Sequence, residues 1–206
     1  LYQACESLEE AHMRGLVHRD IKPSNIFACK LGITYDFVKV LDFGLVKNLS
    51  PQDSLHLTAE GTSAGTPAYM APEVAMGEEQ IDGRVDIYAL GCVAYFLLTG
   101  APVFNEKTAT ATALAHVQKE PIPPSQRSEM QVPAQLEQVV LRCLAKKPED
   151  RPQTAQELQC MLSSCAVPEW TQGNASDWWQ TYLPDASEYR IARQCREITP
   201  ISQAGE

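Results

Sequence analysis

Residues 18–25 read HRDIKPSN, and this stretch decides how the rest of the 206-residue sequence is interpreted. It combines an aspartate, a lysine and an asparagine, residue types that can accept a proton, contact an anion and bind a hard cation. Residues 42–44 read DFG and residues 71–73 read APE. Six specified residues of the first stretch would match by accident on the order of 10⁻⁸ times per position under even residue usage. The pattern is therefore not accidental.

The sequence around this stretch predicts a mostly helical protein. Residues 1–14 place apolar side chains at helical spacing. Residues 25–29 and 37–41 predict two short strands joined through a glycine turn, which is a small hairpin directly after the first stretch. Residues 83–100 are apolar nearly all round and predict a helix that is buried on every side. The predicted fold class is mainly α, or α+β overall.

Three later regions complete this prediction. Residues 42–73 show no hydrophobic period, and a stretch of this length inside a compact domain is typical of a functional loop. Thr154 begins a predicted helix with the pattern of a capping box. The tail after residue 166 carries three tryptophans, which we interpret as packing residues of an additional helix, and residues after Thr199 are predicted to be disordered.

Composition excludes several classes of function. The chain has 17 Lys and Arg against 26 Asp and Glu, a net charge of −9 without a basic cluster, so nucleic acid and anionic membrane are not expected partners. The longest apolar run, residues 87–98, is shorter than the roughly 20 residues that span a bilayer. Seven cysteines without a CxxC pair indicate core thiols in a reducing compartment. We expect a cytoplasmic location, and a membrane anchor outside this segment stays open.

The order and spacing of the three motifs resemble the large, C-terminal lobe of a protein kinase. The sequence of this stretch is most similar to that of bacterial-type serine/threonine kinases. The resemblance covers residues 1–165 and implies a helical lobe with a small β-hairpin beside the catalytic loop, followed by a partly helical extension over residues 166–206. It implies transfer of the ATP γ-phosphate to Ser or Thr hydroxyls of protein substrates, with ATP and Mg²⁺ as cofactors.

The motifs of the kinase small lobe do not occur in this sequence. There is no GxGxxG, and no lysine precedes Lys22. We therefore expect the small lobe to lie upstream of Leu1, and we expect the 206 residues to be a fragment that is inactive by itself. A dimer of the full-length protein is also open.

The resemblance assigns roles to individual residues. Asp20 would accept the proton of the substrate hydroxyl, Lys22 would contact the transferring phosphate, and Thr66 would bond both of them. Asn25 and Asp42 would bind Mg²⁺. A lysine at position 22 also resembles Ser/Thr kinases and not Tyr kinases. The set of cofactor-binding residues that the resemblance implies is Lys22, Asn25, Phe27, Leu41 and Asp42.

Other residues receive structural and regulatory roles from the same resemblance. Asp86 would accept backbone N–H bonds from the catalytic loop, and Arg151 would pair with Glu73. Arg19 would bind a phosphate in the loop after residue 42. The candidate acceptors of that phosphate are Thr58, Thr62 and Ser63. No histidine receives a catalytic role, and His18 is expected to pack and to hydrogen-bond.

A second interpretation is a non-catalytic, kinase-like scaffold or interaction module. Such scaffolds have usually lost one of the three residues that this chain retains as Asp20, Asn25 and Asp42. The sequence therefore favours the enzyme.

Overall fold

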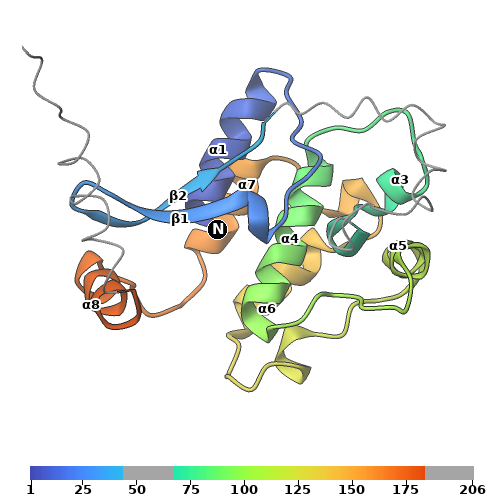
Figure 1. The fold of residues 1–206 in the computed structure, drawn as a ribbon. Coiled ribbons are helices and arrows are strands. Elements are labelled where there is room, and N and C mark those ends of the chain that lie inside the picture. The colour runs from blue at the N-terminus through green and yellow to red at the C-terminus, as the bar shows by residue number, and fades with distance from the viewer. Residues whose placement is uncertain (44–66, 184–206) are drawn as a thin grey trace, which may run out of the picture. The chain divides into compact units, whose positions relative to one another are not determined.

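The computed structural model describes residues 1–43 and 67–183. These residues form helices and one two-stranded sheet (Figure 1). The α-helices are α1 (Tyr2–Met13), α3 (Pro72–Ala75), α4 (Arg84–Thr99), α5 (Ala109–Gln118), α6 (Ala134–Cys143), α7 (Ala155–Ser163) and α8 (Gln172–Tyr182). The strands are β1 (Ile26–Leu31) and β2 (Thr34–Val40), and the 3₁₀ turns are η1 (Pro23–Asn25), η3 (Pro67–Tyr69), η4 (Pro124–Gln126) and η5 (Pro148–Asp150). The predicted mainly helical fold with a small hairpin is confirmed.

The chain divides into two compact units, which we describe separately. Unit 1 contains residues 1–28 and 38–167, and unit 2 contains residues 29–37 and the chain from residue 168 onward. Unit 1 carries the motifs of the sequence analysis. Unit 2 consists of the turn end of the hairpin and helix α8.

Helix α4 is the centre of unit 1. Every residue from Val85 to Tyr95 is buried, because two hydrophobic clusters cover opposite faces of the helix. One cluster includes side chains of α1, α6 and α7, and the other includes side chains of α5 and of the chain around Ala71. Gly91 allows the close approach of α6, since a Cβ atom there would lie 2.5 Å from the Cβ of Cys143. The predicted burial of this helix on every side is confirmed for Val85 to Tyr95. It is wrong for the last turn, where Leu97 is 66% exposed.

The hairpin is longer than the sequence predicts. Its strands begin or end up to three residues beyond the predicted ranges, and Gly32 occupies the turn with φ +60°. The extra residues are Lys30, Leu31 and Thr34–Asp36, whose mixed polarity hides a strand from a search for apolar runs.

The N-terminus of α7 begins as predicted, but its capping differs in one bond. The hydroxyl of Thr154 accepts a hydrogen bond from the backbone N–H of Glu157 at 2.9 Å. The Glu157 carboxylate accepts the N–H of Gln153 at 2.7 Å rather than that of Thr154. The helix therefore has the threonine cap without the reciprocal bond of a capping box.

Four of the cysteines are core thiols, as predicted: Cys5, Cys92, Cys143 and Cys165 are buried. Burial raises the pKa of the Cys143 thiol to about 12, so this group stays protonated. Cys29 is half-buried and Cys160 is exposed, so the prediction is wrong for these two. Cys195 lies outside the described residues, as does the predicted disorder after Thr199.

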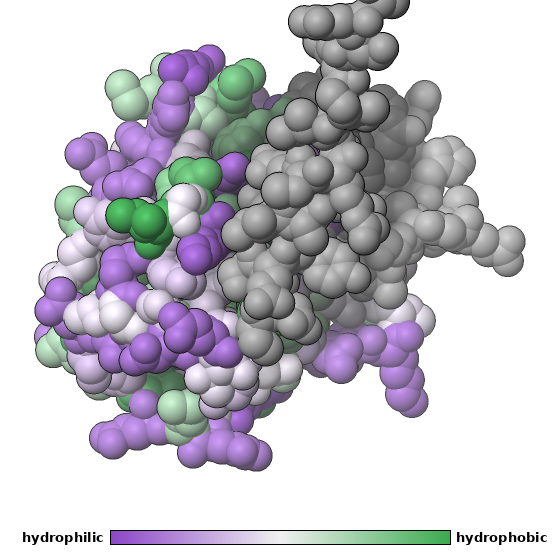
Figure 2. Space-filling view, turned by 60° about the vertical axis from the view of Figure 1, so that its left-hand side comes forward, coloured by the Kyte–Doolittle hydropathy of each residue, from purple (hydrophilic) through white to green (hydrophobic). Residues whose placement is uncertain are grey.

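One face of the described residues carries mainly hydrophilic and neutral side chains. Figure 2 shows hydrophobic residues in small separate groups among hydrophilic ones on the face that it presents. Within residues 1–43 and 67–183, no helix combines the length and the apolar character that crossing a bilayer requires.

Candidate active site

The hairpin brings the first and second motifs together. Pro23 begins the turn η1, in which the backbone N–H of Asn25 donates to the carbonyl of Lys22 at 3.0 Å. Strand β1 starts at the next residue. At the far end of β2, the N–H of Leu41 donates to the carbonyl of Asn25 at 2.8 Å. Because Asp42 directly follows Leu41, this bond brings the backbone of Asp42 close to Asn25.

Three predicted site residues contact one another directly. Lys22 Nζ donates to Asp20 Oδ2 at 2.7 Å. Asn25 Nδ2 donates to the same oxygen at 3.1 Å and to the Asp20 backbone carbonyl at 2.7 Å. The Asp20 side chain is 43% exposed, and its Oδ1 accepts no hydrogen bond from the described residues. One face of the carboxylate is thus fixed while the other can receive a substrate group.

The backbone of this loop is held by Asp86 of α4. Asp86 is 1% exposed, and its carboxylate accepts the N–H groups of His18 and Arg19, each at 2.8 Å. Arg19 adopts φ +65°, a conformation that is costly for a residue with a Cβ atom. The two bonds to a buried carboxylate offset that cost, because hydrogen bonds to a charged group are stronger than neutral ones. The sequence-based assignment of Asp86 therefore agrees with its contacts.

His12 is a contact of Asp86 that sequence reasoning missed. Its Nε2 lies 2.8 Å from Asp86 Oδ2. Its ring lies against Gly83, where a Cβ atom would be 2.5 Å from the ring. The available signal was a polar residue on the apolar stripe of the first helix, which calls for a buried partner.

His18 packs and hydrogen-bonds as expected. Its Nε2 donates to the carbonyl of Leu41 at 2.8 Å, and its Nδ1 accepts the N–H of Asp20 at 3.3 Å. These two partners assign the neutral tautomer with the proton on Nε2. The ring also meets Phe43 edge-on, with centroids 4.7 Å apart. His18 thus joins the first motif to the second through its own ring.

Glu73 and Arg151 form the buried pair that the resemblance implies. Two guanidinium nitrogens of Arg151 donate to the two carboxylate oxygens at 2.6 and 2.8 Å. The remaining N–H groups donate to the carbonyls of Ala145, Arg84 and Lys146 at 2.8 to 3.1 Å. Arg151 is 0% exposed and its donors are all used, so burial leaves none of them unsatisfied.

A second buried polar group lies between α4 and α5. His116 is 0% exposed, its Nδ1 lies 2.8 Å from the Tyr88 hydroxyl, and its ring meets Phe104 edge-on. Its Nε2 has no hydrogen-bond partner among the described residues. Burial lowers the pKa of His116 to about 4, with a smaller contribution from Lys146, whose ammonium group donates to the His116 carbonyl. The ring is therefore neutral at pH 7.

The donor atoms fit a hard divalent cation. Asn25 uses its amide N–H groups on Asp20, and its amide oxygen accepts no hydrogen bond from the described residues. Asp42, with φ +63°, turns the chain out of β2 beside it. Amide and carboxylate oxygens are the ligands that Mg²⁺ prefers. Asn25 and Asp42 are thus suitable ligands by chemistry and by position along the hairpin.

The other predicted site residues divide into two groups. Phe27 on β1 and Leu41 after β2 are 56% and 40% exposed, so both can meet a ligand. The predicted residues that lie outside the described part of the chain are Thr58, Thr62, Ser63 and Thr66.

Comparison with known proteins agrees with this geometry. Residues 1–162 match the protein kinase domain family. The chain is 50% identical over 151 residues to the serine/threonine-protein kinase Pkn1 of Myxococcus xanthus, which covers 73% of the chain and 21% of Pkn1. It is 43% identical over 159 residues to the serine/threonine-protein kinase PknB of Mycobacterium leprae, covering 77% of the chain and 24% of PknB. The chain belongs to the protein kinase domain family.

The match is partial with respect to the relatives. The chain spans about a fifth to a quarter of the length of these two kinases. The family match ends at residue 162, before helix α8 begins.

Proposed function

We propose that this chain is the large-lobe part of a bacterial-type serine/threonine protein kinase, which transfers the γ-phosphate of ATP to Ser or Thr hydroxyls of proteins. Residues 1–165 form this lobe, and residues 166–206 form a C-terminal extension. The observation that carries the proposal is the Asp20 carboxylate. One of its oxygens is fixed by Lys22 and Asn25, at 2.7 and 3.1 Å, while the other accepts no hydrogen bond from residues 1–43 and 67–183.

The residues of the chain act by position and charge. Asp20 accepts the hydroxyl proton of the protein substrate on its open oxygen and orients the attacking oxygen. Lys22 contacts the transferring phosphoryl group, and the resemblance assigns Thr66, which lies outside the described residues, to bond Asp20 and Lys22. Asn25 and Asp42 hold Mg²⁺, which when bound neutralises charge on the phosphates. The neutral His18 keeps the loop and the second motif in register, and it transfers no proton.

Further residues support binding and regulation. Phe27 and Leu41 contact the adenine on one face, which agrees with their exposure. Arg19 is exposed and receives a phosphate carried by Thr58, Thr62 or Ser63, which orders the loop. The partners are ATP and protein substrates, and the location is cytoplasmic.

The test is Asp20→Asn in a protein that also supplies the glycine-rich loop and the strand lysine, neither of which this chain contains. We expect phosphotransfer to a Ser or Thr peptide to fall by about 10² to 10⁴-fold, the usual contribution of general acid–base catalysis. We expect Mg-ATP affinity to stay unchanged, because the metal ligands remain. A Tyr peptide serves as the specificity control. Turnover near that of the unaltered protein would remove Asp20 from this role.

The alternative, a non-catalytic scaffold, predicts a different outcome of the same experiment. A scaffold would bind partners equally well in the unaltered protein and in the Asp20→Asn variant, and it would show no phosphotransfer in either case. The retention of all three polar site residues favours the enzyme.

A further inference from the structure

Helix α8, which follows the region matched by the kinase family, makes a specific contact with the turn end of the hairpin, which lies inside that region. Residues 29–37 and residues from 168 onward form one compact unit. The family match ends at residue 162. We call residues 30–37 the hairpin tip and residues 168–183 the C-terminal segment.

Asp36 of the hairpin tip accepts two indole N–H groups. Trp170 Nε1 donates to Asp36 Oδ2 at 2.8 Å, and Trp179 Nε1 donates to Asp36 Oδ1 at 2.6 Å. Each carboxylate oxygen therefore receives one tryptophan. Indole N–H groups only donate, so an anionic acceptor suits them, and charge-assisted bonds are about twice as strong as neutral ones.

The side chain of Gln172 pairs with the backbone of Tyr35, the residue before Asp36. Its Oε1 accepts the N–H of Tyr35 at 2.8 Å, and its Nε2 donates to the Tyr35 carbonyl at 3.1 Å. The side-chain amide thus occupies both polar groups of a strand residue, as an adjacent strand would do. A two-stranded hairpin has exposed edges and is marginally stable alone, so this pairing supplies what the edge lacks.

The contact also includes the Tyr35 side chain. Its ring lies against Trp179, with centroids 6.2 Å apart, and beneath the ammonium group of Lys30 at 4.5 Å. Hydrogen bonds from Ser176, Lys30 and Gln180 lower the pKa of the Tyr35 phenol. Two of these three residues belong to α8, so the helix contacts the tip along more than one turn.

The backbone of the hairpin tip and the start of α8 each have a local conformation that suits the contact. Asp36 has φ +53°, a conformation that only a few residue types other than glycine adopt readily. Strain of this kind persists where surrounding contacts require it. On the other side, a capping box between Thr171 and Asn174 fixes the start of α8 between Trp170 and the rest of the helix. Ala175 of α8 is 0% exposed.

We propose that the hairpin tip is a docking site for the chain's own C-terminal segment, and that Asp36 selects this segment by binding the indole groups of Trp170 and Trp179. The site fits a helix that presents two tryptophans and one glutamine amide at this spacing. The docking is independent of the proposed catalytic activity, since it uses none of the residues assigned to it.

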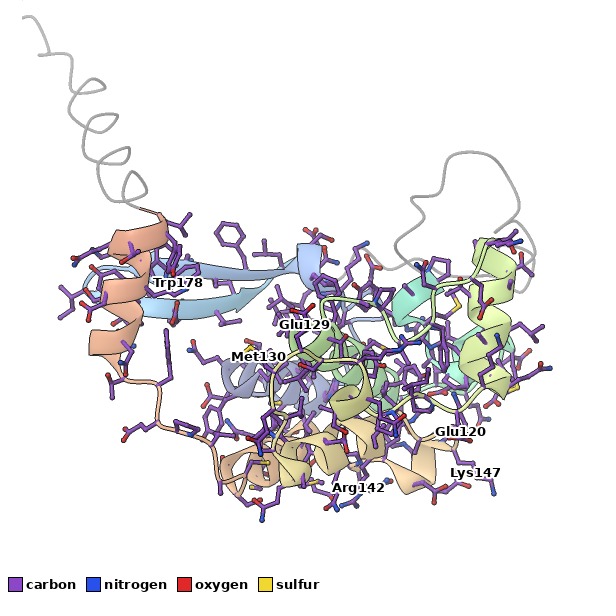
Figure 3. The ribbon with its side chains drawn as sticks, turned by 90° about the horizontal axis from the view of Figure 1, so that it is seen from below. Glu120, Glu129, Met130, Arg142, Lys147 and Trp178 are labelled. Carbon is purple, nitrogen blue, oxygen red and sulfur yellow. The ribbon has the colours of Figure 1, made fainter. Side chains whose placement is uncertain are left out.

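The sequence provides its own internal control. The chain has three tryptophans, and the third, Trp178 (labelled in Figure 3), is 43% exposed. Its ring lies beside that of Tyr182 at a tilt, with centroids 5.2 Å apart. An indole N–H NMR spectrum of the full chain therefore has three signals, which Trp→Phe variants assign. We expect solvent exchange of the Trp170 and Trp179 indole protons to be slower than that of Trp178 by about tenfold or more. Equal, fast exchange of all three would overturn the proposal without any variant at Asp36.

Asp36→Asn then tests the selecting group. Asparagine tolerates a positive φ, so the backbone is preserved while the charge is removed. We expect the Trp170 and Trp179 signals to shift and their exchange to accelerate about tenfold, with the Trp178 signal unchanged. Trp178→Phe is the matched control and should leave the other two signals in place. Unchanged Trp170 and Trp179 signals in Asp36→Asn would overturn the assignment to Asp36.

The same spectra distinguish the chain's own segment from a second copy. Docking within one chain gives indole exchange rates that do not change between low and high protein concentration. Protection that disappears on dilution would show that the segment of a second copy occupies the tip, and would overturn docking in the same chain.

Discussion

Two ion pairs of this chain have the same chemistry and opposite environments. Arg151 and Glu73 are 0% and 4% exposed in their side chains, whereas Lys22 and Asp20 are 23% and 43% exposed. The N–O distances are alike, 2.6 and 2.7 Å. The buried pair uses each donor on a protein acceptor, while the accessible pair leaves one carboxylate oxygen for an external group. Burial thus separates an ion pair that stabilises structure from one that is available for chemistry.

The largest expected effect concerns the buried pair. Arg151→Ala leaves the Glu73 carboxylate buried without its partner and should lower the free energy of unfolding by about 3–5 kcal/mol. For a chain of this size that corresponds to a melting temperature lower by about 10 °C, measurable by calorimetry or circular dichroism. Arg142→Ala is the control, because Arg142 (labelled in Figure 3) is partly exposed and its guanidinium lies 3.0 Å from the Glu157 carboxylate. It should cost about 1 kcal/mol or less. Equal effects of the two variants would contradict the comparison.

The accessible pair should give the reverse pattern. Lys22→Ala should lower the free energy of unfolding by about 1 kcal/mol or less, the usual contribution of an exposed ion pair. In a protein with a complete cleft it should lower turnover by about 10² to 10³-fold, because it removes a charge that stabilises the transferring phosphoryl group. Steady-state kinetics with a Ser or Thr peptide measures this. A large loss of stability with normal turnover would contradict this expectation, because it would show that the Lys22–Asp20 pair stabilises the fold and does not take part in catalysis.

His116 extends the comparison to a buried group without an ionic partner. Its pKa is lowered to about 4 by burial, so the unfolded chain binds a proton between that value and the ordinary value of 6.5 while the folded chain does not. Stability is therefore complete above pH 6.5 and falls as the pH drops towards 4, by up to about 3 kcal/mol. Thermal unfolding at several pH values measures the slope. In His116→Gln this part of the slope should vanish, and an unchanged slope would show that other groups cause it.

The smallest effect concerns the helix that follows Arg151. Thr154→Ala removes the N-cap of α7 and should cost about 1 kcal/mol. Ser163→Ala is the control on the same helix, since the Ser163 hydroxyl donates to the Gln159 carbonyl in an exposed turn. We expect it to stay within about 0.5 kcal/mol of the unaltered protein. A cost of several kcal/mol for Thr154→Ala would mean that the cap also fixes Arg151.

Local pattern was sufficient for most elements and for the motif residues. The all-round apolar stretch predicted α4, and the HRDIKPSN motif supplied Asp20, Lys22 and Asn25, whose side chains contact one another before the hairpin. Two features were not accessible in this way. The strand ends at residues 30–36 mix polar and apolar side chains, and they are bonded to Trp170 and Gln172 rather than buried in a core. A contact between residues more than 130 positions apart leaves no trace in local periodicity.

Histidines and tryptophans show the same limit. His12 was visible as a polar residue on an apolar stripe, but its partner Asp86 is 74 residues away. The tail tryptophans were interpreted as packing residues, and Trp179 does pack on Tyr35. Their indole N–H groups, however, make the specific part of the contact. A residue type predicts what a side chain can do, whereas the fold determines which partner it finds.

The separation of Glu73 from Arg151 has a consequence for synthesis on the ribosome. The two residues are 78 positions apart, and at about 5 to 20 residues per second the arginine is added roughly 4 to 16 s after the glutamate. During that interval a nascent chain cannot bury the Glu73 carboxylate without leaving it uncompensated. Helix α3, which carries Glu73 and packs against α5, is therefore expected to reach its buried position only after residue 151 has emerged, so this part of the domain matures late.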